Sequence, residues 1–440
     1  MTVTDPASDA DNAISDHATP TVRTDELIPL LGAAVPAPRL APGEHAVLVR
    51  LDAAIDEVVA PLAVEHDAAG RYPTRAIHAL KQAGLLALAV PTEFGGVGAG
   101  HAASLEAQVR LAAADSAVAQ VFKVHDELVR EIFVYCPDEL RAPLATRIVD
   151  DHHVLGLAVA ESGKRVDTPW TTTVVPHDAD GAGGWVIDGT KIYTTGAAEA
   201  DEVAVWAFDP TAPGIADDPL LGFRLTLVER GARGMVVHRD WDALGQRATD
   251  SGTITFDGVI APLAAQASIP GRAPLLQNSL RYQAGFAAVL VGIGLGAIRS
   301  ALPFVADSSR PWPSAGVESA TDDPMVRRLC GELAADLVAA YHSTMATGAL
   351  LDRFEQGEID RTQLAVPIYA AKASASRAAI AATSQIHALM GTRSASAAAG
   401  FDRWWRNART LSLHDPLDWK HEEIGRHLLT GWQPEPGIYT

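Results

Sequence analysis

Cysteine and positive charge are both scarce in this sequence. Two cysteines, Cys136 and Cys330, stand in 440 residues, without a CxxC motif or a paired Cys/His spacing. No disulfide framework is expected and no metal site is predicted, and a reducing compartment such as the cytoplasm fits this cysteine usage. The 54 acidic residues outnumber the 35 basic ones, so the formal net charge is −19. Nucleic acids and anionic membranes bind basic surfaces, so neither is an expected partner.

Long apolar runs and a leader-like segment are also missing. The longest uncharged apolar run, Ala284–Ile298, is shorter than the roughly 18 residues expected of a membrane span. The first 20 residues are acidic and polar, without the basic and apolar regions of a signal peptide. We predict a disordered or extended tail over residues 1–44 and a cytoplasmic location.

The rest of the chain falls into three segments by its hydrophobic period. Residues 45–150 carry apolar side chains at three- and four-residue steps, which predicts an N-terminal helical domain. Residues 151–265 hold roughly eight short alternating runs between turn residues, which predicts a compact β-barrel or sandwich. Residues 266–440 return to the helical period, which predicts a C-terminal four-helix bundle with helices near 275–306, 324–356, 363–390 and 417–429. The fold class is therefore predicted as α+β.

One glycine motif within the longest apolar run invites a different interpretation. Gly292, Gly294 and Ala297 fit the G-x-G-x-x-A form of a dinucleotide-binding fingerprint. That fingerprint needs a preceding strand and an acidic residue about 20 positions later, where this chain has Trp312. Small residues along a closely packed helix explain the motif better.

Several short stretches resemble the acyl-CoA dehydrogenase superfamily in their order and spacing, over roughly residues 45–430. Pro91–Gly98 is similar to its glycine-rich turn, and Leu157–Gly163 to the strand and turn that line the flavin. Trp185–Asp201 and Leu244–Pro262 resemble two further segments of the middle domain. The stretch Gly400–Pro416 resembles the flavin-dependent monooxygenase branch, which includes dibenzothiophene monooxygenases and flavin N-hydroxylases.

The resemblance implies a two-component monooxygenase. Such an enzyme takes reduced flavin from a separate reductase and uses O₂, through a C4a-(hydro)peroxyflavin, to oxygenate S, N or C of a small organic substrate. An Arg-x-x-Phe-Gly-like element that serves the adenine half of FAD in the dehydrogenases is absent here, which favours FMN and leaves FAD as the alternative. The family also implies a homo-oligomer, most often a tetramer.

Two other functions stay open at this level. The chain could be an acyl-CoA dehydrogenase with bound FAD and Asp415 as base, since Asp415 occupies the position of the family's catalytic carboxylate. The third hypothesis is a non-catalytic scaffold that retains the fold. Colour on purification separates them, because a dehydrogenase keeps its FAD whereas a two-component monooxygenase binds reduced flavin that is added.

The resemblance also implies roles for particular residues. A monooxygenase site needs a group that gives or takes one proton, and histidine suits this because its pKa lies near neutrality. The candidates are His414 first and His125 second. The flavin-binding candidates are backbone groups and side chains of Glu161, Ser162, Gly163, Tyr193, Thr194, Thr195 and Gly196, with Arg310 and Arg393 as phosphate partners because arginine makes bidentate contacts to phosphate.

Overall fold

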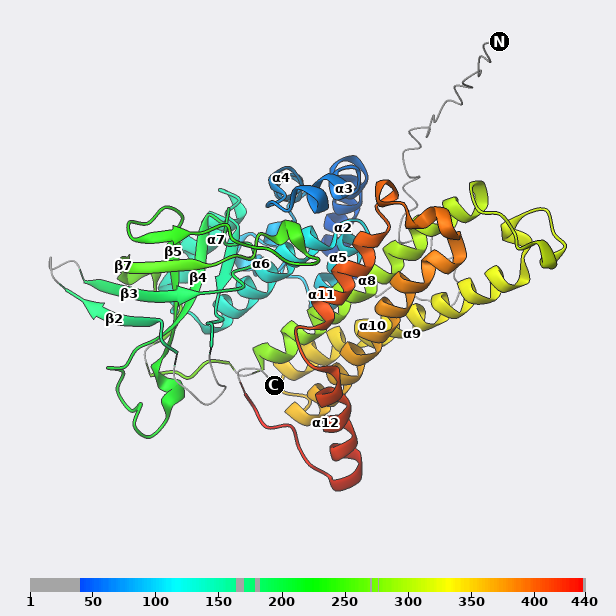
Figure 1. Cartoon of the computed structure of the whole chain (residues 1–440). Helices are drawn as coiled ribbons and strands as arrows, with labels where there is room; N and C mark the ends of the chain where they lie inside the picture. Colours follow the sequence, from blue (N-terminus) through cyan, green and yellow to red (C-terminus); the bar gives the residue numbers. More distant parts are fainter. Residues whose placement is uncertain (1–39, 164–169, 179–182, 270, 276, 438–440) are drawn as a thin grey trace, which may run out of the picture.

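The computed structural model describes residues 40–163, 170–178, 183–269, 271–275 and 277–437. Most of the predicted tail, residues 1–39, lies outside these ranges. A sheet forms one side of the molecule and a set of long helices the other, with the N-terminal helices packed between and above them (Figure 1). The α+β fold class predicted from the hydrophobic period is confirmed.

The N-terminal domain is helical throughout. A π-helical turn lies between its first two helices, α2 and α3. Further along, Asp115 caps the start of helix α6, which follows α5. Asp115 forms that cap by accepting hydrogen bonds from the backbone amides of Ala117 and Val118, which otherwise lack partners at a helix start. The elements are α2 (Pro42–Ala54), the π turn Ile55–Val59, α3 (Ala60–Ala69), α4 (Thr74–Gln82), α5 (His101–Ala112), α6 (Ser116–Tyr135) and α7 (Asp138–Val149).

The middle domain is one seven-stranded mixed sheet that forms an open half-barrel. Its order is β1-β4-β2-β3-β7-β6. The strand β5 lies off this path and pairs with β4 over the whole length of β4. The pairing is antiparallel except where β1 and β2 meet β4. Within the described residues no ladder joins β5 to β6, so the sheet does not close. The strands are β1 (Leu155–Ala158), β2 (Thr173–His177), β3 (Gly184–Lys191), β4 (Glu202–Phe208), β5 (Phe223–Glu229), β6 (Met235–Val237) and β7 (Ile254–Pro262).

The C-terminal domain packs three long helices with two short ones. Four of them lie where the sequence predicts helices, and the fifth, α11, was not predicted as a helix. α11 is short and strongly charged, and only one stripe of it, including Trp404 and Asn407, is buried. The helices are α8 (Asn278–Asp307), α9 (Pro324–Glu355), α10 (Arg361–Met390), α11 (Asp402–Ser412) and α12 (Leu417–Thr430).

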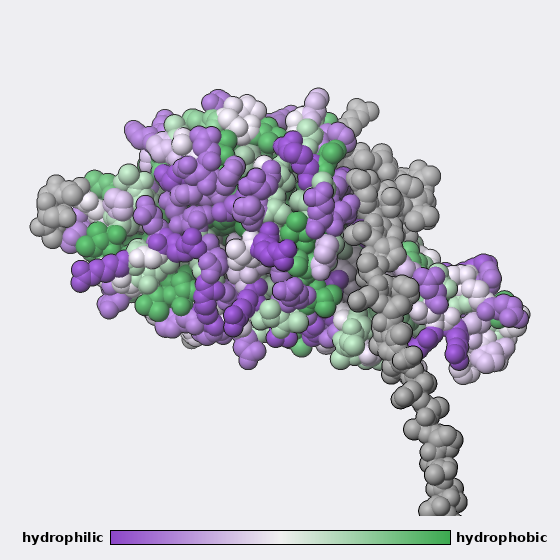
Figure 2. Space-filling view, turned by 90° about the horizontal axis from the view of Figure 1, so that it is seen from above, coloured by the Kyte–Doolittle hydropathy of each residue, from purple (hydrophilic) through white to green (hydrophobic). Residues whose placement is uncertain are grey.

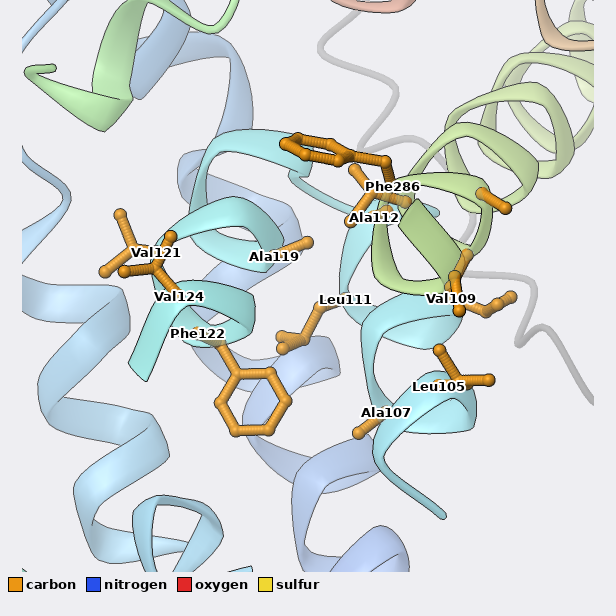
Figure 3. Packing of buried hydrophobic residues seen from close by; sticks show 14 of the residues in the cluster. Leu105, Ala107, Val109, Leu111, Ala112, Ala119, Val121, Phe122, Val124 and Phe286 are labelled. Atoms are coloured by element: carbon orange, nitrogen blue, oxygen red, sulfur yellow. The ribbon is translucent and has the colours of Figure 1, made fainter. Parts of the chain in front are cut away.

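Helix α8 forms the centre of the hydrophobic core. A Cβ on Gly292 would come within 2.5 Å of the Val109 carbonyl oxygen, and one on Gly296 within 2.5 Å of Trp404. These glycines therefore permit close helix packing, as the sequence predicted in place of a dinucleotide fingerprint. In the described chain α8 alone is long and apolar enough to cross a membrane, yet 78% of its most apolar window is buried by neighbouring helices. Figure 3 shows this core, with Phe286 of α8 projecting toward the helices of the N-terminal domain.

The surface differs sharply from this core. Figure 2 shows a face covered mostly by hydrophilic side chains, with separate small hydrophobic patches between them. This distribution agrees with the net charge of −19.

A loop of the middle domain is fixed onto the helices on both sides. The Gln246 backbone amide donates to Asn407 Oδ1 at 2.6 Å, and Gln246 Nε2 donates to Ser116 Oγ at 2.9 Å. Gly245 lies directly on the backbone of α11, where an added Cβ would overlap the Arg406 carbonyl. The loop therefore connects the start of α6 with the middle of α11.

The packing at Gly245 predicts a stability change. Gly245→Ala should lower the free energy of unfolding by about 1–3 kcal/mol or more, because the methyl group must displace backbone. Urea denaturation measures it. The matched control is Gly331→Ala on α9, where no atom lies within 4 Å of the new Cβ, so stability should rise by up to about 1 kcal/mol. Equal effects of the two substitutions would contradict this packing.

Candidate functional site

The turn after β3 holds an exposed aromatic ring in a strained backbone. Tyr193 has φ +53°, a conformation that L side chains rarely adopt, and its side chain is 65% exposed. Its ring meets the Trp241 ring edge-on at 5.9 Å. Thr194 fixes the turn, since both its backbone amide and its hydroxyl donate to the Gly252 carbonyl. The turn thus presents an aromatic surface to solvent on a rigid support.

More strained residues lie in the loop that supports this turn. Arg239, Gln246 and Asp250 also have positive φ, so four of the five such non-glycine residues in the described chain belong to this region. Trp241 donates from its indole nitrogen to the Gln246 carbonyl at 2.9 Å. Strain of this kind persists only where the surroundings fix it, and it clusters at functional sites. The observation marks this edge of the middle domain as a candidate binding surface.

A chain of hydroxyl groups lies beneath the turn. Thr195 Oγ1 is 2.9 Å from Ser251 Oγ, which is 2.7 Å from Thr249 Oγ1. Gly196 follows with φ +75°, and a Cβ there would lie 3.6 Å from Val121 of α6. The predicted residues Tyr193 to Gly196 are therefore contiguous with the strained loop, at the junction with α6.

The predicted flavin-lining turn after β1 is held by a buried carboxylate. Glu161 accepts hydrogen bonds from the amides of Thr171 and Thr172 and from Lys191 Nζ at 2.9 Å. Burial raises the pKa of Glu161, but these hydrogen bonds outweigh it and hold the pKa well below its usual range. The side chain therefore faces inward, while Ser162 and Gly163 are exposed.

The loop between α11 and α12 places His414 and Asp415 over the long helices. The His414 ring lies 4.0 Å from the Phe286 ring of α8, and about half of its side chain is exposed. Its Nδ1 is 3.6 Å from Asp415 Oδ1, and Asp415 also accepts from Gln283 of α8. Packing against Phe286 removes part of the His414 ring from water, and this desolvation and the charge of Lys372 lower the pKa of His414, whereas Asp415 opposes both.

Asp415 keeps its negative charge although it is largely buried. Burial raises the pKa of a carboxyl group, but the neighbouring His414 and the charges of Lys372 and Lys420 lower the pKa of Asp415 to about 2. Asp415 is therefore ionised at every ordinary pH, as a hydrogen-bond acceptor with little basicity.

His125 lies elsewhere, in the core, with both ring nitrogens occupied. Nε2 is 2.9 Å from the Leu86 carbonyl, and Nδ1 accepts from the Leu155 amide at 3.0 Å. Complete burial lowers its pKa. The neutral ring joins the N-terminal domain to β1, and neither nitrogen is free to exchange a proton with a substrate. The sequence alone gave no sign of these two backbone partners.

Arg310 and Arg393 meet at one surface cavity. The cavity lies between the segment before α9 and the end of α10, and Trp312, Asp323, Arg328 and Met390 also line it. Within the described chain, neither the Arg310 nor the Arg393 guanidinium has a hydrogen-bond or ion-pair partner, whereas the Asp323 carboxylate accepts from the Met325 amide at 2.8 Å. Two unpaired guanidinium groups at one cavity suit an anionic group such as phosphate.

Sequence reasoning missed the residues beneath His414. Lys123 of α6 and Lys372 of α10 are completely buried and both approach the Phe286 ring, at 3.9 and 4.4 Å from its centroid. Gln283 completes the floor. A lysine on an otherwise small or apolar helix face, as in Ala371–Ala375, is the signal that could have found one of them.

Known proteins share this three-domain architecture. The acyl-CoA dehydrogenase N-terminal domain matches residues 43–151, the middle domain residues 156–259 and a C-terminal domain residues 284–419. The dibenzothiophene monooxygenase of Rhodococcus qingshengii is 33% identical, over 86% of this chain and 91% of that protein. The probable FMNH2-dependent monooxygenase SfnC of Pseudomonas putida is 30% identical, over 87% of this chain and 94% of that protein.

Solved structures agree with these sequence matches. TdsC from Paenibacillus sp. A11-2, in complex with FMN and indole, superposes with a TM-score of 0.82 at 31% identity, over 90% of this chain and all of that one. Methanesulfinate monooxygenase MsuC from Pseudomonas fluorescens gives 0.78 at 29% identity, over 91% of this chain and all of that one. With all three domains matched and a relative 33% identical over most of its length, this chain belongs to the acyl-CoA dehydrogenase family.

Proposed function

We propose that this protein is a flavin-dependent monooxygenase that uses reduced FMN and O₂ to oxygenate S, N or C of a small organic molecule. The observation that carries the proposal is the His414–Asp415 pair, in which the His414 ring packs on Phe286 and the Asp415 carboxylate already accepts a hydrogen bond from Gln283. The full-length similarity to FMN-dependent monooxygenases supports the same assignment.

The structure carries groups that fit both ends of FMN. Tyr193, with Trp241 at its edge, offers an exposed aromatic face for the flavin ring, beside the hydroxyl of Thr195. Arg310 and Arg393 offer two unpaired guanidinium groups for the phosphate. FMN serves here because its reduced ring activates O₂ for transfer to an organic substrate. FAD remains the alternative cofactor.

The two arginines lie far from His414, the group proposed to act beside the flavin ring. Phe286, below His414, and Asp307, just before Arg310, are separated by 21 residues of continuous helix α8, or roughly 30 Å at 1.5 Å per residue. That exceeds the length of FMN. Figure 1 accordingly shows the C-terminal end of α8 remote from the sheet. We infer that Arg310 and Arg393 bind the phosphate of a flavin held mainly by a partner subunit.

His414 is the group proposed to move a proton. Its lowered pKa keeps the imidazole neutral at pH 7, so that a ring nitrogen can accept a proton from the reacting groups. Asp415, held by Gln283, orients the ring and stabilises the imidazolium that forms. The second histidine candidate, His125, has no free nitrogen and takes no part in this mechanism.

The same geometry disfavours the dehydrogenase alternative. Removal of a proton next to a thioester requires a strong base, and an efficient general base has a pKa near the working pH. Asp415 has a pKa of about 2 and already accepts a hydrogen bond from Gln283. We therefore assign Asp415 to positioning. The proposal further includes a separate flavin reductase as the source of reduced FMN, and a cytoplasmic location.

Arg393→Ala should weaken binding of reduced FMN. Loss of a charge-assisted hydrogen bond costs about 1.5–3 kcal/mol, which is roughly a tenfold or greater change in Kd. Anaerobic titration measures it, and Arg393→Lys should recover only part of the affinity. Arg328→Ala is the matched control, because Arg328 lines the same cavity but is paired with Glu332. Equal affinity for the wild type and Arg393→Ala would remove Arg393 from the site.

The protein should be a homo-oligomer, most simply a tetramer. The phosphate groups of one chain and the ring surface of another can complete one site only if two subunits meet. Light scattering at micromolar concentration measures the mass. A monomer that binds FMN with full affinity would contradict the shared site.

His414→Ala should retain FMN binding yet lose product, with more hydrogen peroxide released. General acid–base groups contribute about 10²–10⁴ in rate. Because neutral His414 is the active form and its pKa is lowered, wild-type product yield should persist to below pH 6.5 and fall as the ring becomes protonated. Dibenzothiophene and indole are the first probes.

Asp415→Asn, measured beside it, separates the two enzyme classes. In a monooxygenase it should reduce product yield less than His414→Ala does. If Asp415→Asn abolished turnover of an acyl-CoA while His414→Ala left that turnover intact, the protein would be a dehydrogenase.

A further inference from the structure

Lys372 is a buried ammonium group without a conventional partner. It lies on α10 with none of its side chain exposed, and within the described chain no hydrogen-bond acceptor reaches its Nζ. Burial of an unpaired charge is strongly unfavourable, so such a group is normally paired or neutral. Lys372 therefore requires an explanation from its surroundings.

An aromatic ring and a carboxylate supply that explanation. Lys372 Nζ lies 4.4 Å from the centroid of the Phe286 ring, the same ring that contacts His414 at 4.0 Å. A cation over an aromatic face is stabilised by the ring, more so when it is desolvated. Asp415 is the anion that stabilises the charge of Lys372. Lys372, Phe286, His414 and Asp415 thus form one cluster drawn from α8, α10 and the α11–α12 loop.

The remaining charges around the cluster are paired among themselves. Lys123 of α6, on the same Phe286 ring, donates to Glu127 at 2.7 Å. Lys420 of α12 donates to Glu423 at 3.2 Å and lies over the Tyr369 ring. Their carboxylate partners offset these two cations. Lys372 has no carboxylate of its own other than Asp415, which it shares with His414.

We propose that Lys372 is a positioning residue that holds His414 in its neutral, proton-accepting form. The positive charge of Lys372 opposes the protonation of His414, and the Phe286 ring contacts both groups. Asp415 draws the ring into place through Nδ1 and is itself kept ionised by Lys372. The inference rests on the proposed role of His414 and adds the group that sets its protonation state.

The titration of Lys372 itself is consistent with this role. Burial, together with the charges of Lys123 and Lys420, lowers the pKa of Lys372 to about 7 against the opposing effect of Asp415. At the lower pH where His414 gains its proton, Lys372 is therefore charged. The repulsion between Lys372 and protonated His414 therefore acts over the pH range in which His414 titrates.

The test measures the pKa of His414 directly. Diethyl pyrocarbonate reacts with neutral imidazole, so the pH dependence of His414 labelling, followed by peptide mass spectrometry on the full chain, reports that pKa. Lys372→Met should raise it by about one unit, the usual effect of removing a like charge nearby. Lys372→Arg, which keeps the charge, should leave it near the wild-type value. Lys420→Met, which removes a lysine paired with Glu423, should change it less.

An unchanged or lower His414 pKa in Lys372→Met overturns the inference, whatever the activity. Lys372→Gln provides the same measurement if the methionine variant does not fold. Product yield against pH is recorded on the same variants. If the His414 pKa rises while the pH profile of product yield stays fixed, the inference about Lys372 holds and the proposed role of His414 fails. If both move upward together, both stand.

Discussion

The close packing of helix α8 is the constraint on which the rest of this structure depends. Gly292 and Gly296 let the backbone of α5 and the Trp404 ring approach to distances that any side chain would prevent. Dense packing of this kind leaves little freedom to the side chains around it. Phe286 and Gln283, on the same helix, therefore meet the α11–α12 loop in a defined arrangement.

The second constraint is the strained edge of the middle domain. Tyr193 and Gln246 keep left-handed backbone conformations because hydrogen bonds to Gly252 and Asn407 hold the segments on either side. Helix α11 takes part in both constraints: Asn407 binds the strained loop, and the end of the helix leads into His414. The surface proposed for the flavin ring and the proton-accepting histidine are thus linked through one short helix.

The order of helices, strands and helices followed from the hydrophobic period, because period reports which face of a segment is buried. The parallel pairing of β1 with β4 could not be predicted in this way, since it joins residues 47 positions apart and leaves no local pattern in the sequence. Tyr193 to Gly196 and the two arginines were proposed from a resemblance, and the structure gathers each set into one place. Their binding roles stay predictions.

His125 and Lys372 show why the remaining features of the site could not be predicted from the sequence. A histidine on a helix can be a proton donor or a structural tie, and only the positions of Leu86 and Leu155 decide between them. The role proposed for Lys372 depends on Phe286 and Asp415, which belong to two other elements of the fold. Such contacts depend on tertiary packing, which a sequence pattern does not encode locally.

A structure of the protein with FMN bound tests the central claim most directly. The account predicts the flavin ring against Tyr193, within reach of His414, and the phosphate on Arg310 and Arg393 contributed by a neighbouring copy of the chain. A flavin bound away from the Tyr193 turn, or a phosphate held entirely by groups of the same chain, would contradict it.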